Sequence, residues 1–173
     1  MIVIILTTLP LLNYILKIME RIMPSYNAKS ESSLIELFPT LEPVNELMGI
    51  YVSELSGPNI LKPVKKLFLK LTGLPGWGGK QFYKGYAFNL IQQKKKTVHG
   101  PKMTLSIEAT ATDGQTGLVA IYEKSAPYIW QHCTDEFRKL NDKTILGMSR
   151  FDLLGLRGKP VMFLLHQAPN NEL

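Results

Sequence analysis

The chain has 173 residues, of which 45% are hydrophobic and 20% are charged, so it is long and apolar enough to bury one sizeable core. This composition excludes a disordered tail, a collagen-like fibre and a disulfide-stapled mini-protein, and the single cysteine, Cys133, excludes an intramolecular disulfide. The net charge of +6 is uneven, because residues 55–107 hold ten lysines and no Asp or Glu. Such a stretch forms either a solvated lysine surface or a surface that attracts an anionic partner.

Residues 1–23 form a hydrophobic leader. Its apolar run is shorter than the ~18 residues of a membrane span and contains Pro10 and Asn13. Three interpretations stay open: an interfacial membrane anchor held by Lys17 and Arg21, a helix packed on the domain, or a spurious upstream start. We expect a cytoplasmic protein, with membrane association through the leader as the alternative.

The globular domain is expected to begin with short helices. Residues 24–33 are polar and are expected to form a linker, which leaves residues 34–173 as one β-barrel domain. Two short helical patterns lie between Ser30 and Met48, each broken by a proline. A first strand is predicted over residues 49–55.

A basic amphipathic helix is predicted over residues 60–71, with Asn59 as its N-cap and Gly73 as its stop. We expect either a surface helix lying on its own core or a lid that meets an anionic bilayer or ligand headgroup. The expected apolar face comprises Ile60, Leu61, Val64, Leu67, Phe68 and Leu71, and the expected solvent face comprises Lys62, Lys65, Lys66 and Lys70.

After a glycine-rich turn at residues 73–80, the hydrophobic period changes from 3.6 to 2, which predicts strands. Asp113 and Gly114 predict a hairpin turn. Short antiparallel strands without βαβ alternation favour a closed or nearly closed up-and-down barrel, with a sandwich as the fallback, and the barrel interior is the default binding site. The strands are predicted at residues 82–91, 103–112, 117–124, 128–133, 137–140, 144–149 and 160–167.

Four segments occur in a characteristic order: LFPTLEPVNELMG, GWGGKQF, DEFRKLNDKTILGM and VMFLLHQ. Over residues 34–167 this order resembles an uncharacterised bacterial family named for its GXWXG motif, although Gly49-Ile50-Tyr51 stands in place of Gly-x-Trp. The match rests on Gly78, Lys80, Phe82, Asp142, Thr144, Leu146 and Gly147.

This resemblance implies a mainly β fold, namely a single antiparallel calycin or lipocalin-like barrel, or a nitrobindin-like one, with short N-terminal helices and one amphipathic helix. It supplies a fold and no established activity. Lipocalin-like barrels commonly carry hydrophobic ligands, and nitrobindin-like barrels carry haem through a histidine.

The sequence contains no motif that identifies a reaction. His99, His132 and His166 have no zinc-ligand spacing, so no metal is expected. His166 is a candidate haem ligand if its strand face points inward. Cys133 is expected to be a buried structural thiol. Nucleic-acid binding is disfavoured because Phe82, Tyr86 and Phe88 share one strand face with core spacing.

We therefore predict a barrel without catalytic residues that binds a hydrophobic, anionic small molecule such as a fatty acid or lipid, with no cofactor. Lys80 and Lys84 are expected to attract the ligand headgroup at the rim. The alternatives are a haem barrel using His166 and a membrane-surface module without a ligand. The residues expected to line the cavity or gate it are Trp77, Tyr86, Phe88, Leu105, Ile107 and Trp130.

Overall fold

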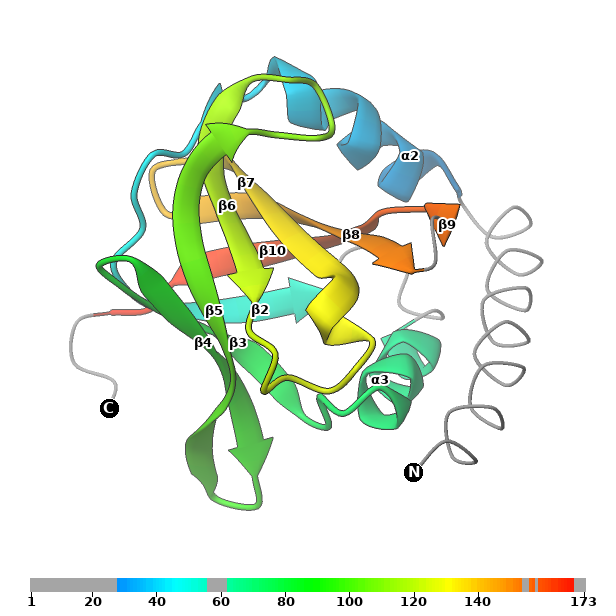
Figure 1. The fold of residues 1–173 in the computed structure, drawn as a ribbon, viewed down its shortest axis with the longest axis vertical. Coiled ribbons are helices and arrows are strands. Elements are labelled where there is room, and N and C mark those ends of the chain that lie inside the picture. Colours follow the sequence, from blue (N-terminus) through cyan, green and yellow to red (C-terminus); the bar gives the residue numbers. More distant parts are fainter. Residues whose placement is uncertain (1–27, 56–61, 154–155, 158, 170–173) are drawn as a thin grey trace.

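The computed structural model describes residues 28–55, 62–153, 156–157 and 159–169. Eight antiparallel strands close into a barrel (Figure 1), in which each strand pairs with the next along the chain and the last pairs with the first. The mainly β, calycin-like barrel predicted from the sequence is therefore confirmed. The barrel strands are β2 (Gly49–Leu55), β3 (Trp77–Tyr83), β4 (Tyr86–Gln93), β5 (Lys96–Ala109), β6 (Thr116–Tyr122), β7 (Cys133–Asn141), β8 (Thr144–Leu153) and β10 (Val161–Gln167).

Two short strands extend the sheet beside the closed ring. β1 (Glu42–Pro43) pairs with β7, and β9 (Leu156–Arg157) pairs with β8. The strand predicted over residues 49–55 coincides with β2, and the predicted turn at Asp113 and Gly114 joins β5 to β6. Side chains alternate between the two faces of a strand, so a strand with one buried face shows alternating apolar and polar residues that can be recognised in the sequence.

Three of the predicted assignments were wrong. Residues 77–80, expected to be part of a turn, belong to β3, and residues 82–91 are two strands separated by a turn at Lys84 and Gly85. Residues 130–132 form a 3-10 helix, η3 (Trp130–His132), rather than a strand. Glycine tolerates positive φ, as at Gly79 (146°) and Gly85 (81°), so a glycine-rich segment can be a strand or a turn.

The N-terminal helical section is α2 (Ala28–Leu37) followed by the 3-10 helix η1 (Phe38–Thr40). α2 begins inside the range 24–33 that the sequence assigned to a linker, and residues 44–48, expected to be helical, are not. Phe38 and side chains from β8 and β10 form a second apolar cluster on the outside of the barrel, opposite the main core within it.

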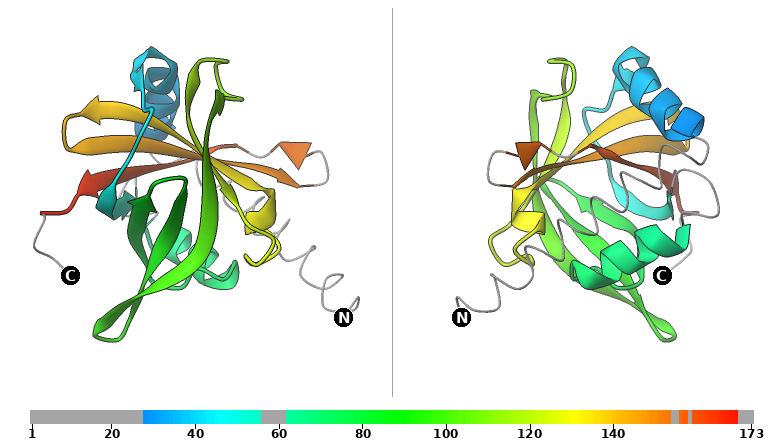
Figure 2. Two further views of the ribbon diagram at one scale, coloured as in Figure 1. Left: turned by 60° about the vertical axis from the view of Figure 1, so that its left-hand side comes forward. Right: turned by 90° about the vertical axis from the view of Figure 1, so that its right-hand side faces the viewer.

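The basic helix is α3 (Lys62–Leu71), and the predicted N-cap Asn59 lies outside the described residues, as do residues 60 and 61 of the predicted helix. α3 lies apart from α2 and beside one end of the barrel (Figure 2). Its expected faces were wrong: Lys65 is buried, whereas Leu67 and Leu71 are 54% and 53% exposed. Phe68 packs edge-on against the barrel residue Phe151, and Lys65, three residues earlier, therefore faces the same way.

The helices of the described segments include none with both the length and the hydrophobicity to cross a bilayer.

Candidate functional site

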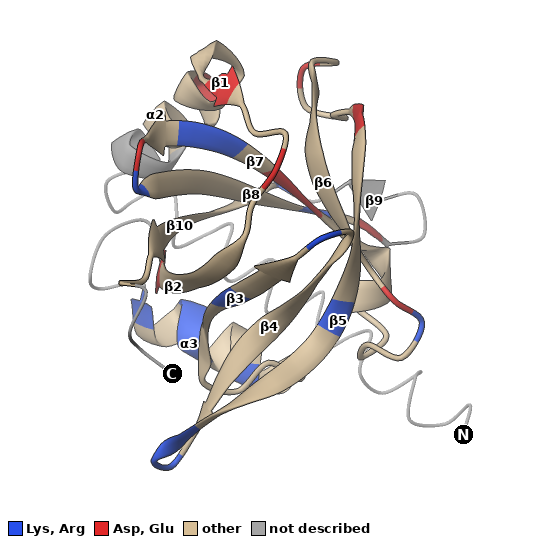
Figure 3. Ribbon diagram, turned by 90° about the vertical axis from the view of Figure 1, so that its left-hand side faces the viewer, with Lys and Arg blue, Asp and Glu red and all other residues tan. Residues whose placement is uncertain are grey.

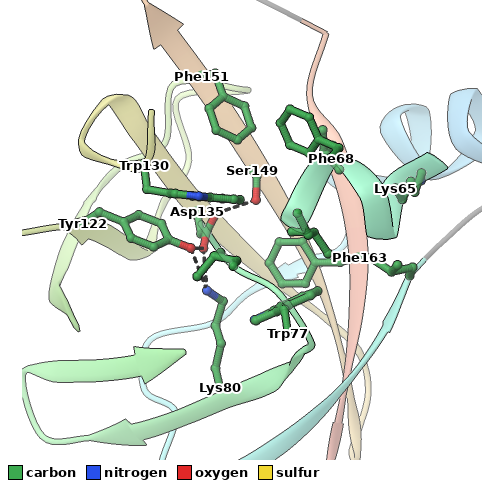
Figure 4. Close-up of a pocket in the computed structure, with 14 residues that line it drawn as sticks. Lys65, Phe68, Trp77, Lys80, Tyr122, Trp130, Asp135, Ser149, Phe151 and Phe163 are labelled. Atoms are coloured by element: carbon green, nitrogen blue, oxygen red, sulfur yellow. Dashed lines mark hydrogen bonds and ion pairs between the residues drawn. The ribbon is translucent and has the colours of Figure 1, made fainter. Parts of the chain in front are cut away.

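The structure contains a pocket between the barrel interior and α3 (Figure 4). Its walls are aromatic and aliphatic except for Lys65, and its other polar groups gather at the inner end, which we call the pocket floor: Lys80, Tyr122, Asp135 and Ser149. The remaining lining residues are Leu55, Lys65, Phe68, Leu69, Leu74, Trp77, Trp130, Phe151, Val161 and Phe163.

An ion pair lies at the centre of the pocket floor. Nζ of Lys80 lies 2.7 Å from Oδ2 of Asp135, and each side chain is only 1% exposed. Ser149 donates a hydrogen bond of 2.6 Å to the other carboxylate oxygen, and the Tyr122 hydroxyl donates one of 3.3 Å to Oδ2. Burying a charge pair is tolerable only when the remaining polar atoms are also satisfied, as they are for this carboxylate.

The remaining hydrogens of Lys80 have unequal partners. One is donated to Oδ1 of Asn89 at 3.0 Å, a strong contact. The Tyr122 hydroxyl and Sδ of Met103 each lie 3.3 Å from Nζ, and a thioether is a weak acceptor. Asn89 also accepts from Nε1 of Trp77 at 2.9 Å and donates to Tyr122 at 3.2 Å.

The register of the barrel brings these side chains together. Lys80 pairs with Asn89 across β3 and β4, and Asp135 pairs with Ser149 across β7 and β8. Directly opposed residues on neighbouring strands point to the same face, so each pair delivers two polar groups to the interior at one level. The pocket floor is therefore fixed by strand pairing rather than by a loop.

Rings surround the Lys80 ammonium. Its Nζ lies 5.8, 5.4 and 5.7 Å from the ring centroids of Trp77, Tyr122 and Phe163. Cation–π attraction at these distances adds to the ion pair and fixes the position of the charge. Trp77 and Phe163 also meet edge to face at 5.4 Å.

Burial controls the protonation of two neighbours of the pair. Burial first, and then the charge of Asp135, raises the pKa of Tyr122 well above its usual 10.0. The same two causes raise the pKa of Cys133 well above its usual 9.0. Both groups are therefore protonated donors at neutral pH, and the Cys133 thiol is inert.

The free space in the pocket is narrow. About 40 Å³ is open to the centres of water-sized molecules, which exceeds the roughly 10–15 Å³ that one water requires. This volume suits a slim chain better than a broad, rigid ring system. Lys65 and Phe68 of α3 lie on the side of the pocket away from Lys80 (Figure 4), which we call the mouth, and Leu69 of the same helix also lines the pocket.

Three of the predicted site residues line the pocket: Trp77, Lys80 and Trp130. Trp130 reaches it from η3, where its Nε1 donates 2.8 Å to the backbone oxygen of Thr72. Lys80 was expected at the rim, but it lies at the pocket floor and its charge is paired with Asp135. It is therefore not available to attract a headgroup from solvent.

Tyr86, Phe88 and Lys84 were misplaced and lie away from the pocket. Phe82 pairs with Ala87 across the turn between β3 and β4, and both are buried in the core, so Tyr86 and Phe88 point outward. Residues 82–91 were predicted to be one strand. Because the chain turns at Lys84 and Gly85, the positions after the turn that face inward are the opposite of those predicted.

Outside the barrel these rings pack on one another. Tyr86 stacks on Tyr83 at 4.8 Å, Phe88 stacks on His99 at 4.4 Å, and Nζ of Lys102 lies 5.3 Å from the Tyr86 ring. Lys84 is exposed at the turn. The reason given above for disfavouring nucleic acid, that Tyr86 and Phe88 share the core face, does not hold.

Leu105 and Ile107 lie on the predicted face of β5 but outside the pocket lining. Leu105 packs against the core cluster, whereas Ile107 is 49% exposed. Ile107 pairs with Leu118 close to the β5–β6 turn, where the barrel ends, so its inward-facing position is open to solvent.

His166 does not point into the barrel. Phe163 and Leu165 on β10 belong to the inner core, so His166, like Met162, lies on the outer face. Its ring contacts Thr144 and Glu54, each at 3.2 Å. The condition set for a haem ligand at His166, an inward face, is not met. The described part of the chain also contains no cluster of three potential metal-ligating side chains.

Asp135, the ion-pair partner of Lys80, was not among the predicted site residues, and neither were Tyr122, Asn89 and Ser149. The signal was the alternation in β7, in which Asp135 lies between the apolar positions Cys133 and Phe137 on one face. An acid at that position has to be buried and therefore paired.

Comparison with solved structures finds a similar fold in the crystal structure of a protein from Thermomonospora curvata. The TM-score is 0.63 at 19% sequence identity, and the match covers 90% of this chain and 99% of that one. At this identity the likeness shows the fold alone. No family model and no curated protein matches the chain. The resemblance to the GXWXG family stays a prediction.

Proposed function

We propose that the protein binds a slim hydrophobic small molecule, such as a fatty-acid derivative or another lipid, inside the barrel without transforming it. The observation that carries the proposal is an apolar pocket whose inner end holds a single polar cluster. Sites for small hydrophobic molecules are concave and mainly apolar, with a few polar groups that orient the ligand. The fold supports this proposal, because closed eight-stranded barrels enclose space for one small ligand.

The pocket floor favours a neutral polar group on the ligand over the anionic group expected from the sequence. The charge of Lys80 is already compensated by Asp135 at 2.7 Å. A ligand carboxylate would lose its water beside Asp135 and gain no unpaired cation among the floor residues. A carbonyl or hydroxyl oxygen of the ligand would instead take the place of the Met103 thioether, which is only a weak hydrogen-bond acceptor for Lys80.

The two tryptophans of the chain, Trp77 and Trp130, both line the pocket, so their fluorescence reports ligand entry directly. We would titrate the full chain at neutral pH with decan-1-ol, decan-2-one and decanoate. Saturable binding is expected, tighter for the alcohol and the ketone than for decanoate. If none of the three binds saturably and native mass spectrometry finds no adduct, the proposal is wrong. A Soret band in the purified protein would replace it with haem binding.

Substitutions can distinguish what the pocket floor contributes to ligand binding from what the walls contribute. Asp135→Asn leaves the Lys80 charge uncompensated, so the preference should reverse toward decanoate. Ser149→Ala keeps both charges and should keep the preference for neutral ligands, which provides a second test if Asp135→Asn does not fold. Leu69→Phe adds bulk to the pocket lining and should weaken all three ligands, whereas Ile107→Lys, outside the pocket, should change none.

A further inference from the structure

Helix α3 has one side toward the pocket and another toward solvent. Lys65 and Phe68 line the pocket mouth and are buried. Leu67 and Leu71 are more than half exposed on the adjoining side of the helix. Val64, half-buried, continues this stripe, because residues three or four apart share one side of a helix. These neighbouring leucines form a small exposed apolar patch that an apolar partner can cover.

A row of lysines runs beside the leucine stripe. Lys66 and Lys70 are both exposed and lie four residues apart, and α3 contains no Asp or Glu. Figure 3 shows the lysines of α3 without an acidic residue on the helix. Lys62 of α3 forms a long ion pair with Glu54, at 3.9 Å.

From this arrangement we propose that α3 docks on an anionic lipid bilayer. Leu67 and Leu71 would enter the boundary between headgroups and acyl chains, and Lys66 and Lys70 would contact the lipid phosphates. An amphipathic helix with apolar residues on one side and lysines beside them lies in the plane of such a surface. Each lysine near an anionic leaflet adds to the attraction, so the charge pattern selects anionic over neutral lipid.

The inference rests on the proposed function for its purpose. Phe68, on the same helix, lies at the pocket mouth. A docked α3 therefore places the mouth next to the acyl chains, from which a hydrophobic ligand can enter without crossing water. Docking itself requires only the outer side of α3.

The test needs a local signal, because the leader at residues 1–23 is also hydrophobic and can bring the full chain to vesicles on its own. An environment-sensitive thiol dye on the full-length Leu67→Cys variant provides one. The native Cys133 is 2% exposed with a raised pKa, so it does not compete for the dye. The matched control is the same dye on Ile107→Cys, near the β5–β6 turn, at the other end of the barrel from α3 (Figure 1).

We expect the dye on Leu67→Cys to shift to the blue with vesicles of phosphatidylcholine and phosphatidylglycerol, and not with phosphatidylcholine alone. High salt should reverse the shift, because exposed charges are screened. Adding Lys66→Gln and Lys70→Gln should weaken the binding reported by this dye roughly 30-fold. Lys95→Gln with Lys96→Gln, which removes two exposed lysines from the β4–β5 turn, should leave it unchanged.

Two outcomes would overturn the inference. In one, the protein binds vesicles but the dye on Leu67→Cys stays in water. In the other, the shift is indifferent to anionic lipid and to the two lysines. The decanol titration in vesicle-free solution tests the pocket separately. Intact decanol binding without docking refutes only the docking, and docking without decanol binding refutes only the ligand.

Discussion

Lys80 and Asp135 form an ion pair of 2.7 Å between β3 and β7, on opposite sides of the barrel interior, with each side chain 1% exposed. Two properties of the site depend on this pair: the neutral net charge of the pocket floor and the position of the ring cluster around the ammonium group.

Asp135→Asn should cost about 3–5 kcal/mol of unfolding free energy, because it leaves a buried ammonium without its counter-charge. Replacing both partners, with Lys80→Met and Asp135→Leu together, should cost much less than the sum of the two single changes. Urea denaturation of the four proteins gives the coupling energy. Additive single changes would mean that the two charges do not stabilise each other.

Stability should fall at alkaline pH through Tyr122. Its pKa is raised in the folded state above the usual 10.0, so the stabilisation is complete below pH 10 and decreases as the pH rises from there toward the native pKa. Urea denaturation between pH 8 and 11 measures the effect, and phenolate absorbance follows the ionisation. Tyr122→Phe should reduce this alkaline loss. An unchanged slope in that variant would assign the loss to another group, with Cys133 the next candidate.

Acid should weaken a second buried pair, on the outside of the barrel. Burial alone would raise the pKa of Asp113, but hydrogen bonds from Thr110, the Gln115 backbone and Arg138, with the Arg138 charge, lower it below its usual 3.8. The stabilisation is therefore full above pH 3.8 and is lost as the pH falls through the lowered native pKa.

Asp113→Asn should remove roughly 2–3 kcal/mol at neutral pH, because Arg138 loses two charge-assisted hydrogen bonds of 2.8 and 2.9 Å. The variant should also show a shallower loss of stability below pH 4 in urea titrations. Asp142→Asn, at a pair whose carboxylate is 94% exposed, is the control and should change neither quantity appreciably. Equal losses from the two substitutions would contradict the importance of burial.

Gly147→Ala should distort the pocket, although Gly147 itself does not line it. A Cβ at Gly147 would collide with the Phe163 ring, which lines the pocket. Overpacking of this kind costs about 1–3 kcal/mol, and displacement of Phe163 should alter the fluorescence of Trp77, which it contacts. Phe163→Leu in the same protein should restore much of the stability. If Gly147→Ala is as stable as the parent, the β8–β10 packing differs from that described.

The sequence was sufficient for the barrel because its strands carry local signals. The alternation in residues 103–112 and the turn at Asp113 and Gly114 predicted a strand and a hairpin that the structure contains. Both signals depend on neighbours within a few residues, which a single sequence records fully. The closed barrel itself was favoured because the sequence shows short antiparallel strands without βαβ alternation.

The site was harder to predict because it depends on relations between distant residues. Nothing local distinguishes Lys80 from the nine other lysines of residues 55–107. Only the pairing of β3 with β4 and of β7 with β8 shows that Lys80 and Asp135 point into the same space. The outward positions of Tyr86 and Phe88 depended on one unrecognised turn, since a shift of one residue exchanges the two faces of a strand.

The position of β10 in the ring also determines how the protein is made. β10 is the last strand of the barrel, and it pairs on one side with β2, the first, and on the other with β8. Until residues 161–167 leave the ribosome, two strand edges stay open to pairing with other chains and the Lys80 and Asp135 charges stay hydrated. Cutting the chain before Val161 would therefore do more than remove one strand, because it would leave the barrel with a gap between β2 and β8 through which water reaches the interior.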